Sequence, residues 1–148
     1  MPLFKFDVKS NLKTVLFGLN KAVEDSLNEI GDAIVHHAHD LAPVDTGRLQ
    51  DSYIKDVDAG KSRVRVGSPL DWAAYVELGT GPYYQTPPGW IDNFMKRGYH
   101  TTAPWWYFDD YYEEWRLGGF VRAQPHLRPA FLNYVNEYIR ICKRNLGG

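Results

Sequence analysis

The sequence predicts an α+β fold in which a long N-terminal helix and a C-terminal helix pack on a small antiparallel β-sheet. Three observations support this fold class: apolar residues at helical spacing near both ends, an alternating segment bounded by turn residues, and a long aromatic-rich stretch without a period. A chain of 148 residues is long enough for one domain with a core and short for two. We therefore interpret residues 1–148 as one domain with an insertion at about 82–123.

The first periodic segment predicts an amphipathic helix from about Ser10 to Leu41. Ser10 is a suitable N-cap, and Pro43 ends the helix because it restricts Ala42 to extended geometry. Gly18 and Gly31 are expected to mark bends or close packing. The apolar residues, spaced by threes and fours on one face, are Leu12, Val15, Leu16, Leu19, Ala22, Val23, Leu27, Ile30, Ala33, Ile34, Ala38 and Leu41.

A β-hairpin is predicted next, over residues 52–57 and 61–67. The segment Arg63-Val64-Arg65-Val66 alternates polar with apolar residues as a half-buried strand does, and Asp58-Ala59-Gly60 forms the turn. We expect this hairpin to lie over the long helix. A short helix follows, with Asp71 as its cap and Gly79 as its left-handed stop.

The segment from Gly81 to Gly119 shows no period and is rich in aromatic residues. Such a long irregular stretch in a compact domain is usually functional or disordered, and the aromatic content argues against disorder. Tyrosine and tryptophan are enriched in the cores of protein interfaces. We therefore predict contacts with partner proteins at Trp90, Trp105, Trp106, Tyr107, Tyr111, Tyr112 and Trp115.

A C-terminal helix is predicted from Leu127 to Cys142, with Pro129 accepted in its first turn. Its apolar residues share one face, so we expect it to pack beside the first helix. Cys142 is the single cysteine, which excludes an internal disulfide, and it is expected to be a small buried hydrophobe.

The overall charge excludes a general nucleic-acid-binding field. The chain has 17 Lys and Arg residues against 18 Asp and Glu, for a formal net charge of -1. No run of about 18 apolar residues is present, and the N-terminus lacks the pattern of a signal peptide. We expect a protein of a cytosol-like compartment, or of a particle assembled there, without membrane contact.

The triplet Asp45-Thr46-Gly47 also occurs in aspartic proteases, where two such aspartates share one proton. Here the triplet follows a helix and is followed by Arg48, a cation that would disturb such a pair. The preferred interpretation is that Asp45 caps a turn and Gly47 allows a tight backbone.

Four side chains near the end of the first helix are of metal-ligand type: His36, His37, His39 and Asp40. No His-Glu-x-x-His frame is present, and helix C-termini favour histidine for electrostatic reasons. We predict no metal site, no cofactor and no catalytic residue.

Asp109, Asp110, Glu113 and Glu114 lie among tryptophans and tyrosines, as the two carboxylates of a carbohydrate cleft do. Nothing in the sequence fixes their separation, and neighbouring carboxylates are more often a solvated face. An interface is the preferred interpretation of this region. A carboxylate-based cell-wall glycan hydrolase is the enzymatic alternative.

Lys61, Arg63 and Arg65 are predicted to share one face of the first hairpin. Such a stripe suits contact with the phosphates of DNA passing through a channel. It suits equally well the solvent face of an antiparallel pair. No phosphate-binding glycine loop is present.

Three motifs lie where periodic elements begin or end: Ala42-Pro43 with Asp45-Thr46-Gly47 and Leu49, then Tyr75-Val76-Glu77-Leu78-Gly79-Thr80, and last the segment 125–130. Their positions predict structural corners at Pro43, Asp45, Thr46, Gly47, Glu77, Gly79, Thr80, Pro125, Arg128 and Pro129. We also expect Asp45, Thr46 and Arg48 to fix an internal corner. Residues 77–80, together with the insertion, are expected to contact neighbouring subunits.

Taken in order, these motifs resemble the gene-ten-like neck and tail-completion proteins of long-tailed, siphovirus-type bacteriophages. The resemblance covers about Ser10 to Gly81 and the chain from Pro125 onward. The segment from Pro82 to Ala123 is longer and more aromatic than the short loop expected in that family.

The resemblance implies an α+β fold and a noncatalytic structural role at the junction of capsid and tail. It implies a tail-completion or head-tail joining protein of the virion, assembled in the host cytoplasm as one copy in a ring, for which a hexamer is one candidate. The implied partners are the tail terminator or tube and the head-closing ring. DNA in transit is a further candidate partner.

Overall fold

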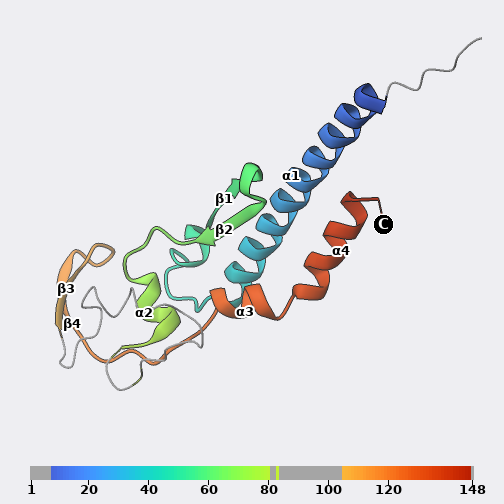
Figure 1. Ribbon diagram of the computed structural model, residues 1–148. Helices are drawn as coiled ribbons and strands as arrows, with labels where there is room; N and C mark the ends of the chain where they lie inside the picture. Colours follow the sequence, from blue (N-terminus) through green and yellow to red (C-terminus); the bar gives the residue numbers. More distant parts are fainter. Residues whose placement is uncertain (1–7, 81–82, 84–104, 148) are drawn as a thin grey trace, which may run out of the picture.

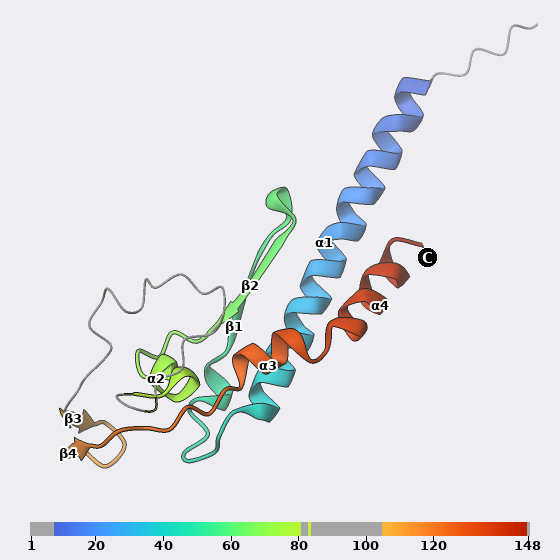
Figure 2. The ribbon, with the colours of Figure 1, turned by 60° about the horizontal axis from the view of Figure 1, so that its bottom comes forward.

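The computed structural model describes residues 8–80, 83 and 105–147. A long helix, α1, forms the spine, with a hairpin along one side and two C-terminal helices along the other (Figures 1 and 2). The predicted α+β class is confirmed. The elements are α1 (Val8–Leu41), β1 (Ile54–Asp58), β2 (Arg63–Gly67), α2 (Ala73–Leu78), β3 (Trp105–Asp109), β4 (Glu114–Gly118), α3 (Leu127–Leu132) and α4 (Val135–Asn145), with single 3-10 turns at Gln50–Ser52 and Ala59–Lys61.

Helix α1 ends at Leu41 as predicted, and the Ala42 N–H still donates to the Ala38 carbonyl at 3.0 Å before Pro43 stops the pattern. Its start was predicted wrongly, because Ser10 lies inside the helix rather than at the N-cap. The residues from Val8 onward all tolerate helical geometry, so the capping preference of one serine does not set the boundary.

The core lies at the C-terminal half of α1, where the first hairpin, α2 and α3 converge. Its buried members are Ile34, Ala38, Ala42, Leu49, Tyr53 and Ala130. The apolar stripe of α1 also extends beyond this core, since Val15, Leu16 and Leu19 are exposed. The sequence thus predicted the helical face correctly but not how far the rest of the chain covers it.

Strands β1 and β2 form the predicted antiparallel hairpin, with Asp56 opposite Arg65 and Asp58 opposite Arg63. Its other face meets α1, where Lys55 and Val64 leave no room for a side chain at Gly31. Close packing is therefore confirmed at Gly31. At Gly18 the expectation of close packing is wrong, because no atom lies within 4 Å of an added Cβ.

Helix α2 begins at Ala73, later than predicted, and its cap position is Trp72. Asp71 as cap is wrong, because it lies in the preceding turn, which the Ala73 N–H closes on the Leu70 carbonyl. Gly79 ends the helix with a positive φ of 76°, as predicted, but its ψ of 179° is extended rather than left-handed helical. This geometry sends the chain alongside residues 121–123.

The single predicted C-terminal helix is two helices, α3 and α4, separated at Asn133 and Tyr134. Two side-chain contacts favour the break: the Tyr138 hydroxyl donates to the Ala130 carbonyl, and the Tyr134 ring stacks on His37 at 3.5 Å. Both helices pack on α1, which confirms the predicted neighbourhood. Pro129 lies in the first turn of α3, as expected.

The described part of the insertion contains a second hairpin, β3–β4, which the sequence reading missed. Phe108 lies opposite Trp115, and Trp106 opposite Leu117. Aromatic residues occupy consecutive positions of β3, so no alternation of polar and apolar residues revealed the strand. Trp90 lies outside the described residues.

Candidate interaction surfaces

The buried corner of the molecule centres on Glu77 of α2, which is 7% exposed. Its carboxylate accepts the backbone N–H groups of His126 at 2.8 Å, Leu127 at 2.9 Å and Arg128 at 3.0 Å. These are donors that a helix N-terminus leaves without intrahelical partners, and the residue at the cap position of α3 supplies no side-chain cap of its own. Glu77 therefore caps α3 from a distant part of the chain, with the favourable sign for the helix dipole.

His126, 1% exposed, completes this corner. Its Nδ1 lies 2.7 Å from the Gln124 carbonyl and 3.2 Å from Glu77 Oε2. Because both neighbours are acceptors, we assign the proton to Nδ1. The Tyr53 ring meets the imidazole edge-on at 5.8 Å, and the buried Tyr53 hydroxyl has no hydrogen-bond partner. Burial, and then the charge of Glu77, raise the pKa of Tyr53.

Gly79 and Thr80 pack against residues 121–123, the segment that follows the second hairpin. The Thr80 N–H donates to the Val121 carbonyl at 2.9 Å, and the Val121 N–H donates to Thr80 Oγ1 at 2.8 Å. A Cβ at Gly79 would lie 2.5 Å from the Tyr83 carbonyl oxygen and 2.8 Å from the Ala123 nitrogen. Glu77, Leu78 and Thr80 are all buried, so the expectation that residues 77–80 contact neighbouring subunits is wrong.

The Asp45-Thr46-Gly47 triplet lies on a turn after α1, where Gly47 has a φ of 80° and its carbonyl accepts the Asp51 N–H at 3.1 Å. The side chains of Asp45, Thr46 and Arg48 are exposed. The expectation that they fix an internal corner is therefore wrong. Their exposure also leaves Asp45 without the burial that couples the aspartates of a protease.

The other predicted corner positions are Pro43, Pro125, Arg128 and Pro129. Pro125 is exposed and precedes the cap position of α3, whereas Arg128 and Pro129 lie half-buried in its first turn. Pro43 is half-buried directly after α1.

The four candidate metal ligands do not converge. His36 and His39 contact Asp40 at 3.4 Å and 3.1 Å, whereas His37 pairs with Glu137 at 2.8 Å. The hydrogen bond from His39 is the main cause that holds the pKa of Asp40 below its usual value. Among the described residues, no group of three or more His, Cys, Asp or Glu side chains is arranged to hold a metal ion.

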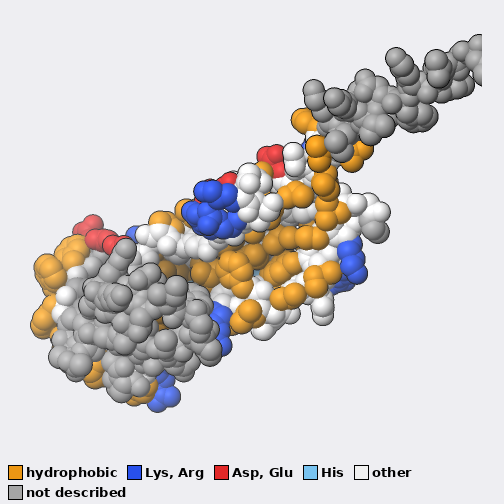
Figure 3. Space-filling view, viewed as in Figure 1, with side chains coloured by type: hydrophobic (Ala, Val, Ile, Leu, Met, Phe, Trp, Pro, Cys, Tyr) orange, Lys and Arg blue, Asp and Glu red, His pale blue; other side chains and the backbone are white. Residues whose placement is uncertain are grey.

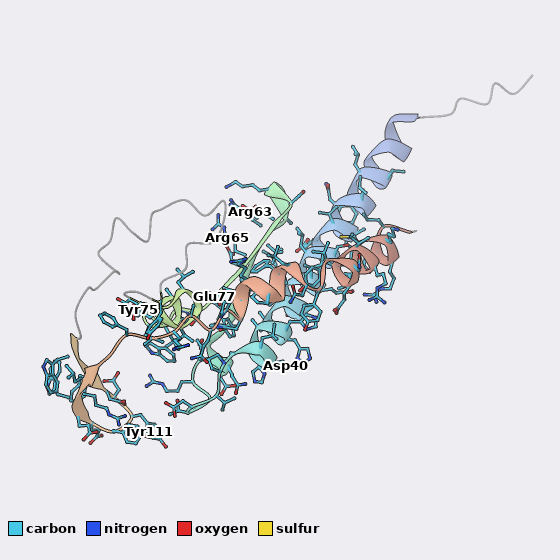
Figure 4. All side chains as sticks on the ribbon, turned by 90° about the horizontal axis from the view of Figure 1, so that it is seen from below. Asp40, Arg63, Arg65, Tyr75, Glu77 and Tyr111 are labelled. Atoms are coloured by element: carbon cyan, nitrogen blue, oxygen red, sulfur yellow. The ribbon has the colours of Figure 1, made fainter. Side chains whose placement is uncertain are left out.

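The second hairpin presents an exposed aromatic face, which we call the aromatic face and define as Trp106, Phe108, Trp115 and Leu117. The register places these four side chains on one side of the hairpin. Their exposed fractions are 65%, 46%, 66% and 58%. Two further predicted contact residues, Tyr111 and Tyr112, are exposed in the turn, and Figure 4 shows Tyr111 at the end of the molecule away from α4.

The carboxylates of this hairpin have structural partners. Asp109 accepts the N–H groups of Tyr111 at 3.0 Å and Tyr112 at 3.2 Å, and Arg116 lies 3.4 Å from its second oxygen. Desolvation raises the pKa of Asp109, but these hydrogen bonds outweigh it and leave the pKa below the usual value. A glycosidase acid needs a raised pKa, so Asp109 is unsuited to that role.

The basic residues of the first hairpin have acidic neighbours. Arg63 and Arg65 lie 3.7 Å and 3.6 Å from Asp58 and Asp56 of the opposite strand. Lys61 lies in the turn rather than in the strand, 3.5 Å from Asp58. Figure 4 shows Arg63 and Arg65 side by side on the hairpin. Their contact with DNA remains a prediction, weakened by this local neutralisation.

None of the described helices combines the length and the apolarity needed to cross a bilayer.

Residues 6–79 match a protein-family model described as "Bacteriophage HK97-gp10, putative tail-component". The match runs from the start of α1 through the first hairpin to Gly79. The chain belongs to this family. The HK97-gp10-like region thus includes the first motif of the predicted resemblance and the second up to Gly79, whereas the motif at 125–130 and the second hairpin lie beyond the matched residues.

No curated protein and no solved structure matches the chain.

Sequence reasoning missed several residues of this HK97-gp10-like protein that the fold brings together. Phe108 and Leu117 belong to the aromatic face, and Tyr53 and His126 belong to the buried corner. Pairing 105–109 against 114–118 across the acidic turn would have revealed the aromatic face. No local signal links Tyr53 to His126, because the two residues are far apart in sequence.

Proposed function

We propose that this protein is a structural subunit of the head-tail junction of a bacteriophage virion, where it completes the tail as one copy in a homo-oligomeric ring. Membership of a tail-component family carries this proposal. The neighbours it would meet are the tail terminator or tube on one side and the head-closing ring on the other.

Exposed apolar surface supports an assembly role. Monomeric soluble proteins rarely expose contiguous apolar patches larger than roughly a few hundred Å², and larger patches usually mark interaction sites. The aromatic face lies at one end of the molecule, and α4, which carries exposed apolar residues, lies well away from it beside α1 (Figures 1 and 3). A ring requires two different faces on each subunit, because its contacts are heterologous.

The experiment is electron microscopy of lysates from a phage that lacks this gene, beside the same phage complemented with the wild-type gene. We expect full capsids separated from tails, or abnormal tails, and normal virions after complementation. Joined virions of normal appearance without the gene would refute the junction role.

We also propose that the protein is not an enzyme. The hydrolase alternative is tested by incubating the purified chain with peptidoglycan, beside a variant with Asp109→Asn and Glu113→Gln. No glycan cleavage above the level of the variant is expected, since Asp109 is held ionised by its partners. Cleavage by the wild type that the variant lacks would restore the enzymatic interpretation.

A further inference from the structure

Several apolar surfaces have no partner among the described residues, including the stripe of α1 at Val15, Leu16 and Leu19, and two of them differ in the charge beside them. One is the aromatic face of the second hairpin, whose strands have extensive contacts only with each other among the described elements. The other is an open apolar groove of about 460 Å³ on one face of α4, which we call the α4 groove. It is lined by Val135, Ile139, Cys142, Leu146 and the stem of Lys143, among others.

We propose that the aromatic face of one copy docks in the α4 groove of a second copy. This inference deepens the proposed function, because it names the two surfaces that would join neighbouring subunits of the ring. The occupant is a second copy of this chain, and charge is the reason for choosing it.

The charges beside the two surfaces are complementary. The turn of the second hairpin carries four carboxylates, at positions 109, 110, 113 and 114, against one guanidinium, that of Arg116. Lys143 lines the α4 groove without an acidic residue beside it in the lining, whereas Arg140 and Arg144 lie with Glu29, Asp32 and Glu137 on another face of α4, where Arg144 pairs with Glu29. Figure 3 shows acidic atoms beside the hydrophobic atoms at the hairpin end and basic atoms at the α4 end. Opposite potentials of this kind orient a contact and discourage the reversed one.

Shape and size agree with such a contact. The two surfaces lie well apart on an elongated subunit, with α2 and α3 between them, so one copy cannot bring its own hairpin to its own α4 (Figures 1 and 2). Aromatic side chains bury roughly 150–250 Å² each. With Tyr111 and Tyr112, the aromatic face therefore offers on the order of 700 Å², close to the ~800 Å² per partner of a standard interface.

Cys142 provides the test, because it lines the groove and is the single cysteine of the chain. In the full-length Leu117→Cys variant, each copy carries one thiol on the aromatic face and one in the groove. A disulfide requires Cα atoms roughly 4.4–6.8 Å apart, so oxidation joins only surfaces in direct contact. We expect oxidation of the concentrated chain to give a ladder of covalent dimers, trimers and larger species on a non-reducing gel.

Two matched controls make the result specific. Adding Cys142→Ser to Leu117→Cys leaves one thiol, so no species beyond a dimer is expected. Ile54→Cys places the second thiol on an exposed residue of β1, outside both surfaces, and is also expected to stop at dimers.

The inference is overturned if Leu117→Cys forms no species beyond the dimer, or if Ile54→Cys gives an equal ladder. A second variant, Trp115→Cys, also combines a thiol on the aromatic face with Cys142. It guards against unfavourable disulfide geometry at position 117 alone. A defect of the phage lacking the gene, combined with no ladder, would leave the junction role intact and remove this interface. A ladder combined with normal virions from the phage lacking the gene would support this interface and remove the junction role.

Discussion

The Glu77 carboxylate accepts the Leu127 N–H at 2.9 Å, so a residue of α2 closes the N-terminus of a helix that begins 50 residues later. The segment between them includes the second hairpin, and its return to the body is fixed by Thr80 and Val121. The aromatic face therefore projects from a loop whose two ends are bound to one another.

Glu77→Ala is expected to lower the free energy of unfolding by about 1–3 kcal/mol, because it leaves the buried N–H groups of α3 without acceptors. Glu77→Gln keeps one acceptor oxygen and is expected to cost less. Urea denaturation followed by circular dichroism measures both variants. Glu24→Gln, at an exposed position of α1, is the control. Equal stability of Glu77→Ala and the wild type would contradict the capping role.

Two glycines should respond to alanine in opposite directions. Gly79→Ala is expected to cost about 2–4 kcal/mol, because φ is positive and the added Cβ would meet the Tyr83 carbonyl oxygen at 2.5 Å. Gly18→Ala should stabilise α1 locally by about 0.5–1 kcal/mol, since nothing lies near it. Thermal unfolding and helical content by circular dichroism report the two effects. A loss of helix in Gly18→Ala would show that this position is packed.

Tyr53, which is buried, and Tyr138, which is half-buried, differ in what their hydroxyls contact. Tyr53→Phe should leave stability unchanged or raise it by up to about 1 kcal/mol, because the hydroxyl is buried without a partner. Tyr138→Phe should cost about 1 kcal/mol, because its hydroxyl donates to the Ala130 carbonyl at the break between α3 and α4. Burial raises the pKa of Tyr138 to about 12, so the hydroxyl remains a donor at neutral pH. Chemical denaturation of the two variants should rank them in this order.

The turn of the second hairpin should lose order in acid. The folded pKa of Asp109 lies below its unfolded value, so its contribution is complete above about pH 4 and is lost as pH falls through the folded pKa. Near-ultraviolet circular dichroism, which senses the Phe108 and Trp115 pair, should follow this titration. Asp109→Asn keeps an oxygen for the Tyr111 N–H and should flatten the profile. An unchanged acid transition in that variant would assign it to another group.

The first hairpin is not expected to retain DNA. Because Asp58 and Asp56 oppose Arg63 and Arg65, replacing both arginines by alanine should leave gel retardation of duplex DNA unchanged at low salt. Binding with a steep salt dependence that the double variant loses would instead support contact with DNA in transit.

Local patterns in the sequence predicted the elements better than their packing. Apolar residues spaced by threes and fours predicted the long helix, and Pro43 predicted where it ends. Alternation of polar and apolar residues predicted the first hairpin. The second hairpin was not predicted, because aromatic residues follow one another along β3 and hide any alternation. The break in the last helix was not predicted either, because its causes are contacts of Tyr134 and Tyr138 with other residues.

The sequence by itself determined the α+β class, the family motifs and the enrichment of aromatic residues in the insertion, because these depend on residue types and on short spacings. Only the tertiary structure decided which motif residues are buried and which are exposed. Glu77 and Thr80 are buried, because their side-chain oxygens accept hydrogen bonds from backbone N–H groups some 40–50 residues away in the sequence. Asp45 and Thr46 are exposed. The aromatic face likewise required the pairing of two strands before four side chains shared one side. Long-range hydrogen bonds and strand register leave no local trace, and they determine which surfaces remain for partners.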